Sequence, residues 1–163
     1  MARAVALRQL TSGPRTRAQL AAAMKRRNVP DDVAEAVLDR FEDVSLVDDE
    51  EFARQWVTTR HVGRGLARRA LSYELRQRGV ADDVVKDAVG ALTGEDELAA
   101  ARELVRRRAP AMRADDPARR TRRLAGMLAR KGYSGGVAMR AIREELGAAG
   151  DADDESWTAG DPE

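Results

Sequence analysis

A helix-turn-helix pattern occurs three times in this chain of 163 residues. The three copies span residues 16–41, 67–92 and 120–145 and align without gaps. A period of about 50 residues is typical of helical repeats, in which each unit stacks on its neighbours. The period therefore predicts an all-α chain of three tandem three-helix, helix-turn-helix-like repeats that form an elongated, curved array.

One residue suited to a left-handed turn divides each copy into two amphipathic segments. These residues are Asn28, Gly79 and Gly132. Glycine adopts positive φ without a steric penalty, and asparagine tolerates it at the end of a helix. In the first copy, Thr16 and Gln19 are predicted to form a capping box that begins a helix with Leu20 and Met24 on one face. The helix after Asn28 is expected to present Val33, Val37, Leu38 and Phe41 to the core. Each copy therefore predicts two helices joined at its turn residue.

A further helical segment precedes each copy and gives every repeat its third helix. We predict these segments at about residues 3–10, at 48–62, and from about residue 95 to Pro110, a residue that bends or ends a helix. Together with their copies they define the predicted repeats, which span residues 1–46, 47–93 and 94–147.

The last segment, residues 148–163, differs in composition from the rest of the chain. It contains six acidic residues and no basic ones, so the preceding body has 29 basic against 22 acidic residues. A polar, acidic segment cannot bury enough apolar surface to offset its ordering entropy, and we predict a disordered tail. The tail either keeps the chain soluble or mimics nucleic acid and competes for the basic body.

The residue types available exclude most enzyme chemistry. The chain has no cysteine and a single histidine, His61. The acidic run at residues 48–51 lacks the alternating spacing and the glycine of a calcium loop. The glycines near residues 63–65 and 135–136 lack the spacing of a phosphate-binding loop. We therefore predict a protein that is not an enzyme and has no catalytic residue, cofactor site or metal site.

The apolar pattern also indicates where in the cell the protein is found. No apolar run approaches the roughly 20 residues that cross a bilayer, and arginines interrupt the first residues too often for a secretory signal. The absence of cysteine suits a reducing compartment. We expect a cytoplasmic monomer that makes no membrane contact.

Two aromatic residues, Phe52 and Trp56, lie four positions apart on one face of the predicted helix 48–62. Aromatic residues are few in this chain, so we expect this pair to anchor the core of the middle repeat. The alternative is an exposed interface hot spot or a platform for base stacking.

A specific signature surrounds this pair. Residues 46–57 read LVDDEEFARQWV, and residues 131–134 near the end of the chain read KGYS. The signature continues after residue 57 through Arg60, Gly65, Leu71, Glu74, Leu75 and Gly79. Over about residues 5–146 the chain resembles the RecX family of RecA regulators.

The resemblance implies a function as well as tandem three-helix repeats. It implies a protein that binds RecA filaments along their helical groove and inhibits RecA ATP hydrolysis, strand exchange and co-protease activity. Such a protein modulates recombination, DNA repair and the SOS response. The chain departs from the family pattern at Asn28, where a glycine is expected, and in its acidic tail.

Basic residues of the second and third repeats are the candidate contacts to a RecA filament, to DNA phosphates, or to both. Repeated basic helices match a filament whose subunits also repeat, whereas the alternative is a solvated face with cations at helix ends. The candidates are Arg60, Arg64, Arg68, Arg69, Arg76, Arg78, Arg119, Arg120, Arg122, Arg123, Arg130 and Lys131.

A helix-turn-helix DNA-binding protein or transcription factor is the alternative function, because the body is basic. Aspartate pairs at residues 31–32 and 82–83 argue against it, since they begin the helices that would enter the major groove. These helices also lack a cluster of Asn, Gln and Arg side chains suited to base edges. We expect nonspecific affinity for single- or double-stranded DNA through its phosphates.

Overall fold

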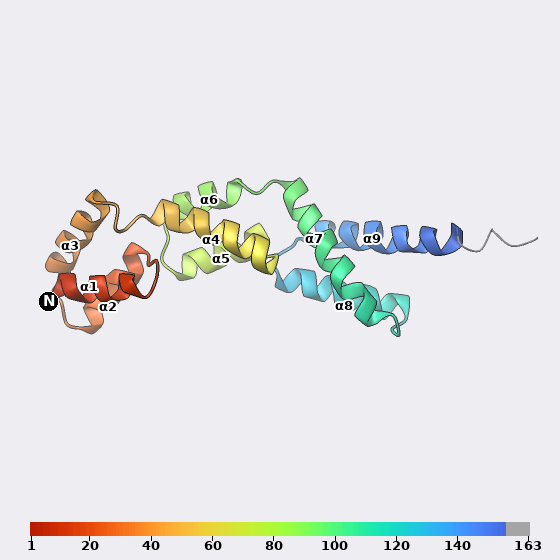
Figure 1. Cartoon of the computed structure of the whole chain (residues 1–163), viewed down its shortest axis with the longest axis horizontal. Helices are drawn as coiled ribbons and strands as arrows, with labels where there is room; N and C mark the ends of the chain where they lie inside the picture. The colour runs from red at the N-terminus through yellow and green to blue at the C-terminus, as the bar shows by residue number, and fades with distance from the viewer. Residues whose placement is uncertain (156–163) are drawn as a thin grey trace, which may run out of the picture. The chain divides into compact units, whose positions relative to one another are not determined.

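The computed structural model describes the backbone of residues 1–155 and the side chains of residues 1–147. Within this range the regular elements are nine α-helices and one short 3-10 helix, with no strand (Figure 1). The predicted all-α class is therefore confirmed. The elements are α1 (Ala2–Thr11), α2 (Arg17–Arg26), α3 (Asp31–Asp43), α4 (Asp49–Arg64), α5 (Arg68–Gln77), α6 (Asp82–Gly90), α7 (Gly94–Arg108), η1 (Ala109–Met112), α8 (Pro117–Arg130) and α9 (Gly135–Glu155).

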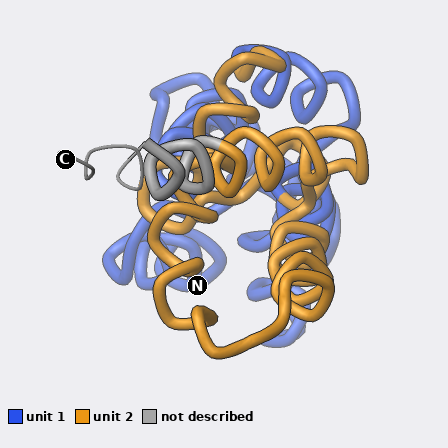
Figure 2. The backbone as a smooth tube through the Cα atoms, turned by 90° about the vertical axis from the view of Figure 1, so that its right-hand side faces the viewer, with its two compact units in different colours: residues 1–60, 71–91 blue, residues 61–70, 92–163 orange. Residues whose placement is uncertain are grey.

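The chain divides into two compact units, which Figure 2 draws in different colours. Unit 1 contains residues 1–60 and 71–91, and unit 2 contains residues 61–70 and 92–163. The division falls inside α4 and α5, so each of these helices contributes residues to both units. The first repeat lies wholly in unit 1 and the third wholly in unit 2.

In unit 1, α1, α2 and α3 pack against one another around an apolar core. Leu20, Met24, Leu38 and Phe41 are its large buried side chains. They recur at helical spacing on α2 and α3, as the sequence predicts, and their burial supplies most of the driving force that holds these short helices together.

The predicted ends of α2 are confirmed. Thr16 Oγ1 accepts a hydrogen bond from the amide of Gln19 (3.1 Å), and Gln19 Oε1 accepts one from the amide of Thr16 (3.0 Å), which completes a capping box. After α2, Asn28 has a φ of 59°, the left-handed conformation that its place in the sequence predicts.

Val33 differs from the expectation that it packs in the core, because its side chain is 43% exposed. The buried residues of α3 are Ala34, Leu38 and Phe41. Val33 precedes the first of these by one position, which turns its side chain by about 100° around the helix axis. The other predicted core residues of α3 agree with the expectation, since Leu38 and Phe41 are buried and Val37 is partly buried against the same core.

Also in unit 1, the turn after α5 contacts the start of α2. Thr16 Oγ1 donates a hydrogen bond to the carbonyl of Arg78 (2.7 Å), and Thr16 is fully buried. Gly79 has a φ of +79°, and a Cβ atom on it would lie 2.3 Å from the Cβ of Ala18. The second repeat therefore needs glycine here for the turn and for the close approach to the first repeat.

In unit 2, the turn after α8 contacts the start of α5 in a similar way. The amide of Ala67 donates to the carbonyl of Lys131 (2.9 Å). Gly132 has a φ of +95°, and a Cβ atom on it would lie 2.6 Å from the amide nitrogen of Ala70. Ala67 occupies the position of Thr16 in the aligned copies, so the two junctions use equivalent positions.

The third repeat packs α7, α8 and α9 around its own core in unit 2. Thr93 caps α7 by accepting a hydrogen bond from the amide of Asp96 (3.0 Å). The predicted interruption at Pro110 is confirmed, since α7 ends at Arg108 and the chain continues as η1. Asp116 then caps α8, and Pro117 is its first residue.

The last helix, α9, ends at Glu155, beyond residue 147, where the predicted third repeat ends. It therefore enters the segment 148–163 for which the sequence predicts disorder. The rest of that prediction concerns residues 156–163, which lie outside the described residues.

Candidate functional site

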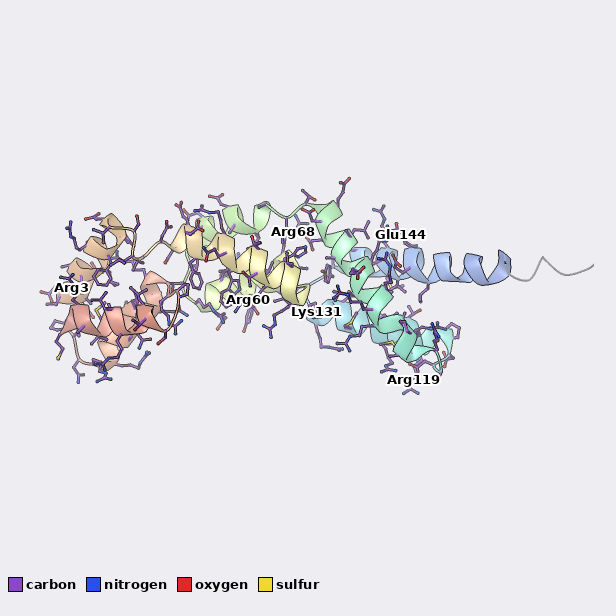
Figure 3. All side chains as sticks on the ribbon, viewed as in Figure 1. Arg3, Arg60, Arg68, Arg119, Lys131 and Glu144 are labelled. Atoms are coloured by element: carbon purple, nitrogen blue, oxygen red, sulfur yellow. The ribbon has the colours of Figure 1, made fainter. Side chains whose placement is uncertain are left out.

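The structure places the twelve predicted basic residues in several environments, and some of them form contacts that stabilise the fold. Arg68, which is labelled in Figure 3, forms an ion pair with Glu97. The Glu97 side chain is only 7% exposed. A buried carboxylate is costly unless a cation and hydrogen bonds compensate it. Arg68 therefore has a structural role, which the prediction of a partner contact did not anticipate.

Three further candidates pair with acidic residues at the surface. Arg76 contacts Asp82 (2.9 Å), while Arg119 and Arg123 both contact Asp115 (3.8 and 2.6 Å). Their side chains remain about half exposed or more, and exposed ion pairs of this kind are weak. These arginines therefore remain accessible to a partner.

Four other candidates lie on α5 and α8 without converging on one site. Arg69, Arg122 and Arg130 are exposed, and Arg120 is half-buried. The Nε atom of Arg120 is buried and has no hydrogen-bond partner in the described part of the chain. Arg120 occupies the position that Thr16 and Ala67 hold in the two earlier copies, where each forms a junction to the following repeat.

Two candidates, Arg64 and Lys131, meet in a groove of about 740 Å³ in unit 2. Lys131 Nζ donates a hydrogen bond to the carbonyl of Arg64 (2.7 Å). Arg107 and Arg108 at the end of α7 also line this groove, as does His61. We name these five residues the basic groove.

The basic groove carries a net positive charge. Its four permanent cations face two carboxylates that also line it, those of Asp96 and Glu103. Hydrogen bonds from the backbone and side chain of Thr93 hold the pKa of Asp96 below its ordinary value, so this carboxylate is ionised at neutral pH. Arg107 is paired with Glu103 (3.0 Å). The excess charge of the groove therefore suits an anionic ligand.

The loop between α4 and α5, residues 65–67, forms one wall of the basic groove and is held by hydrogen bonds from Tyr133 and His61. Tyr133 is buried, and its hydroxyl donates to the carbonyl of Gly65 (2.8 Å). Burial raises the pKa of the Tyr133 phenol, which therefore stays protonated and able to donate. His61 Nδ1 lies 2.9 Å from the carbonyl of Leu66, and since a carbonyl only accepts, Nδ1 carries the hydrogen.

Three residues of the basic groove, His61, Arg107 and Arg108, are not among the twelve predicted contacts. Arg107 and Arg108 belong to an arginine triplet and follow Leu104 at helical spacing, so the sequence places Leu104 and these two arginines on neighbouring faces of α7. Only the packing of α7 beside the loop of Arg64 brings them to the same groove.

The remaining candidates, Arg60 and Arg78, meet in unit 1 at Trp56. Their guanidinium carbons lie 3.3 and 3.8 Å from the centroid of the indole ring. The expectation that Phe52 and Trp56 anchor the core is wrong, because Ala53 and Val57 are the buried residues of α4. Phe52 and Trp56 stack on each other with centroids 5.6 Å apart and are only half-buried.

The described residues offer no arrangement for metal chemistry. Among residues 1–147 there is no group of three or more His, Asp or Glu side chains that could hold a metal ion. In the same part of the chain no helix is long and apolar enough to cross a membrane.

Three successive regions of the chain match the three-helix domains of RecX proteins. The first RecX three-helix domain matches residues 2–41, the second matches residues 48–89, and the third matches residues 95–142. The chain belongs to the RecX family. The resemblance to RecX and the prediction of three tandem three-helix repeats are therefore confirmed.

Named relatives support membership of the RecX family over most of the chain. The regulatory protein RecX of Thermobifida fusca (strain YX) is 60% identical over 149 residues, which cover 91% of this chain and 80% of that protein. The regulatory protein RecX of Streptomyces coelicolor is 54% identical over 145 residues, which cover 89% of this chain and 77% of that protein. The chain is accordingly a regulatory protein of the RecX type.

Solved RecX structures have the same fold. The crystal structure of RecX from Lactobacillus salivarius aligns with a TM-score of 0.80 at 19% identity, covering 88% of this chain and 94% of that chain. A second crystal structure, of a regulatory protein RecX, aligns with a TM-score of 0.77 at 24% identity and covers 88% and 70% of the two chains.

Proposed function

We propose that this chain binds RecA nucleoprotein filaments along their helical groove and inhibits RecA ATP hydrolysis, strand exchange and co-protease activity. It thereby modulates recombination, DNA repair and the SOS response. The observation that carries this proposal is the match of three successive domains to RecX, a family of regulatory proteins. The chain acts in the cytoplasm as a monomeric binding protein and catalyses no reaction.

Inhibition by binding requires a difference in affinity between filament states. A ligand that binds the active and inactive states equally shifts neither population. The chain therefore binds more tightly to a filament state that hydrolyses ATP slowly or cannot grow. An array of similar repeats suits this task because successive repeats contact successive RecA subunits.

The basic groove supports contact with an anionic surface of the filament. Arg64 and Arg108 line it, and both side chains are exposed. Cations that replace the counterions of DNA phosphates give a binding constant that falls as salt rises. We therefore assign the groove to contact with DNA phosphates within the filament, independent of base sequence.

Sequence-specific DNA binding is the less favoured function. Asp31, Asp32, Asp82 and Asp83 begin α3 and α6, and all four are exposed. In a helix-turn-helix protein the start of the recognition helix enters the major groove, where these carboxylates would meet the phosphates of both strands. Selection of one DNA sequence over random competitor at physiological salt would support this function instead.

A titration of DNA-dependent ATP hydrolysis by the cognate RecA tests the proposal. Substoichiometric amounts of the full chain are expected to depress the rate, because one bound chain affects several subunits of a filament. Unchanged hydrolysis at saturating amounts would exclude filament inhibition.

Variants of the basic groove test whether it contacts DNA phosphates. The double variant Arg64→Gln/Arg108→Gln is expected to bind single-stranded DNA more weakly and to reduce the slope of log K against log salt by about one to two, since two phosphate contacts are lost. Arg3→Gln/Arg8→Gln, two changes on exposed faces of α1, is the matched control. An unaltered slope in the groove variant would remove the groove from the interface.

A further inference from the structure

Arg60 and Arg78 converge on a single indole ring in unit 1. Arg60 extends from α4, one turn after Trp56, and Arg78 lies in the turn that follows α5. Their guanidinium carbons are 3.3 and 3.8 Å from the ring centroid. Trp56 is itself fixed, because its Nε1 donates a hydrogen bond to Glu74 Oε2 (2.9 Å). We name these four residues the Trp56 cluster.

The Trp56 cluster has more positive charge than its own carboxylate neutralises. It contains two guanidinium groups and one carboxylate, Glu74. The Oε2 atom of Glu74 already accepts from Trp56, and Arg60 Nε is 3.8 Å from the same oxygen, too far for a hydrogen bond. The Nε atom of Arg60 is buried, and the described part of the chain supplies no acceptor for it.

The positive charge of Arg78 is also only partly compensated by groups of the chain. One of its Nη atoms donates to the backbone carbonyl of Glu74 (3.0 Å). Burial lowers the pKa of Arg78, and the nearby charge of Arg60 adds to this effect, although Glu74 opposes it. Two cations placed together with unused donors are stabilised by a further anion, which the described chain does not provide at this position.

The cluster is also ordered before any ligand arrives. Stacking on Trp56 restricts both guanidinium groups, so little side-chain entropy remains to be lost on binding. A guanidinium offers parallel N–H donors that match the two oxygens of a carboxylate or phosphate group. The Arg60 and Glu74 side chains are 28% and 25% exposed, so a ligand group can reach the cluster from solvent.

The composition of the cluster favours a protein carboxylate over a DNA phosphate. Half-buried tryptophan and arginine together are typical of hot spots in protein interfaces. A DNA backbone presents many phosphates, and the carboxylate of Glu74 would repel those next to the bound one. One side-chain carboxylate at the centre of a protein contact brings no neighbouring phosphates for Glu74 to repel, and it uses both guanidinium groups.

We propose that Arg60 and Arg78, held on Trp56, form a binding site for one Asp or Glu side chain of the protein partner. Under the proposed function, on which the identity of the partner rests, this residue belongs to a RecA subunit of the filament. Arg60 and Arg78 bind the carboxylate, whereas Trp56 and Glu74 are positioning residues that fix the two guanidinium groups.

Charge-conserving variants of the full chain test the site through their affinity for RecA filaments. Arg60→Lys keeps the charge but removes the planar fork, and it is expected to weaken binding about tenfold, the effect of one lost charge-assisted hydrogen bond. Arg54→Lys is the matched control, because Arg54 lies on the same helix and pairs with Glu51 (2.7 Å) outside the cluster. Equal affinities of the two variants would overturn the proposal.

The variant Glu74→Gln is expected to increase filament affinity, a result that a purely structural role of the Trp56 cluster would not produce. The amide oxygen of glutamine can still accept from Trp56, while the negative charge beside the site is lost. Filament affinity is expected to rise about threefold or more, since a nearby like charge has been removed from the bound carboxylate. An unchanged or weaker affinity in a variant with unaltered circular dichroism and Tm would contradict the proposed site.

Two further measurements separate this site from DNA binding and from the proposed function. If Arg60→Lys weakens binding to an isolated oligothymidine as much as binding to the filament, the ligand is a phosphate and the proposal is overturned. If the wild-type chain does not bind RecA filaments, the proposed function fails, and the site is tested with a blocked hexaglutamate peptide. A shift of the Arg60 Hε–Nε resonance on adding this peptide supports the site, and its absence excludes it.

Discussion

Gly132 approaches Ala70 so closely that a Cβ atom on the glycine would lie 2.6 Å from the amide nitrogen of the alanine. The contact joins the turn after α8 to the start of α5, and a hydrogen bond from Ala67 to Lys131 accompanies it. Gly79 and Ala18 form the corresponding contact one repeat earlier. The glycine in the turn of a repeat therefore does two things, since it adopts positive φ and admits the backbone of the preceding repeat.

Gly132→Ala is expected to lower the free energy of unfolding by about 2 kcal/mol or more, because the alanine would have both a strained φ and a contact with backbone that cannot move aside. Gly136→Ala is the control, since a Cβ there meets open space at the start of α9. Urea unfolding followed by circular dichroism measures both. Equal stabilities of the two variants would show that the junction does not need a glycine.

Asn28 stands where the resemblance to RecX leads us to expect glycine and where the two later repeats have Gly79 and Gly132. The junctions explain why asparagine is tolerated here. A repeat that follows another must bring its turn against the earlier one, but the first repeat has only to reach a φ of 59°. Asn28→Gly is expected to change the free energy of unfolding by only about 0.5 kcal/mol. Gly79→Asn is expected to cost about 2 kcal/mol or more, since its Cβ would lie 2.3 Å from that of Ala18. Comparable Tm values for the two exchanges would contradict this explanation.

Arg68 and Arg69 are adjacent but should respond differently to charge reversal. Arg68→Glu places a second carboxylate against buried Glu97 and is expected to destabilise the fold by about 3 kcal/mol. Arg69→Glu, on the exposed side of α5, should change the stability by no more than about 0.5 kcal/mol. Thermal unfolding distinguishes the two, and only the Arg69 variant is suited to a test of filament binding. A stable Arg68→Glu chain would refute the structural role of Arg68.

Glu145 gives the stability of the third repeat a dependence on pH. Burial alone would raise the pKa of Glu145, but hydrogen bonds from Arg106 and Arg102 outweigh burial and hold the pKa below its ordinary value of 4.5. Since the pKa is lower in the folded state, this stabilisation is present above pH 4.5 and is lost as the pH falls through the folded-state value.

Glu145→Gln is therefore expected to lower the free energy of unfolding by about 1 kcal/mol at pH 7 and by less at pH 3. Urea unfolding between pH 7 and pH 3 measures the difference between the variant and the wild-type chain. Glu50→Gln, an exposed change on α4, is the control. A difference that stays constant over this range would mean that ionised Glu145 does not stabilise the fold.

The sequence was sufficient to predict the local structural features of the chain. The period of the turn residues predicts the repeats, and capping residues such as Thr16 and Gln19 predict where a helix begins. These features depend on hydrogen bonds and φ angles within a few residues, so a short stretch of sequence contains all the interacting groups. The RecX signature is likewise local, because it lies mainly within residues 46–79.

Whether a basic side chain serves the fold or a partner was decided by tertiary structure alone. Arg68 and Arg69 are neighbours in sequence, yet only the position of Glu97 makes one of them structural. Arg107 and Arg108 reach Arg64 only because α7 packs beside the loop at residues 64–67. A cation takes its role from the charges around it, and those charges come from residues that are distant in the sequence and become neighbours only when the helices pack.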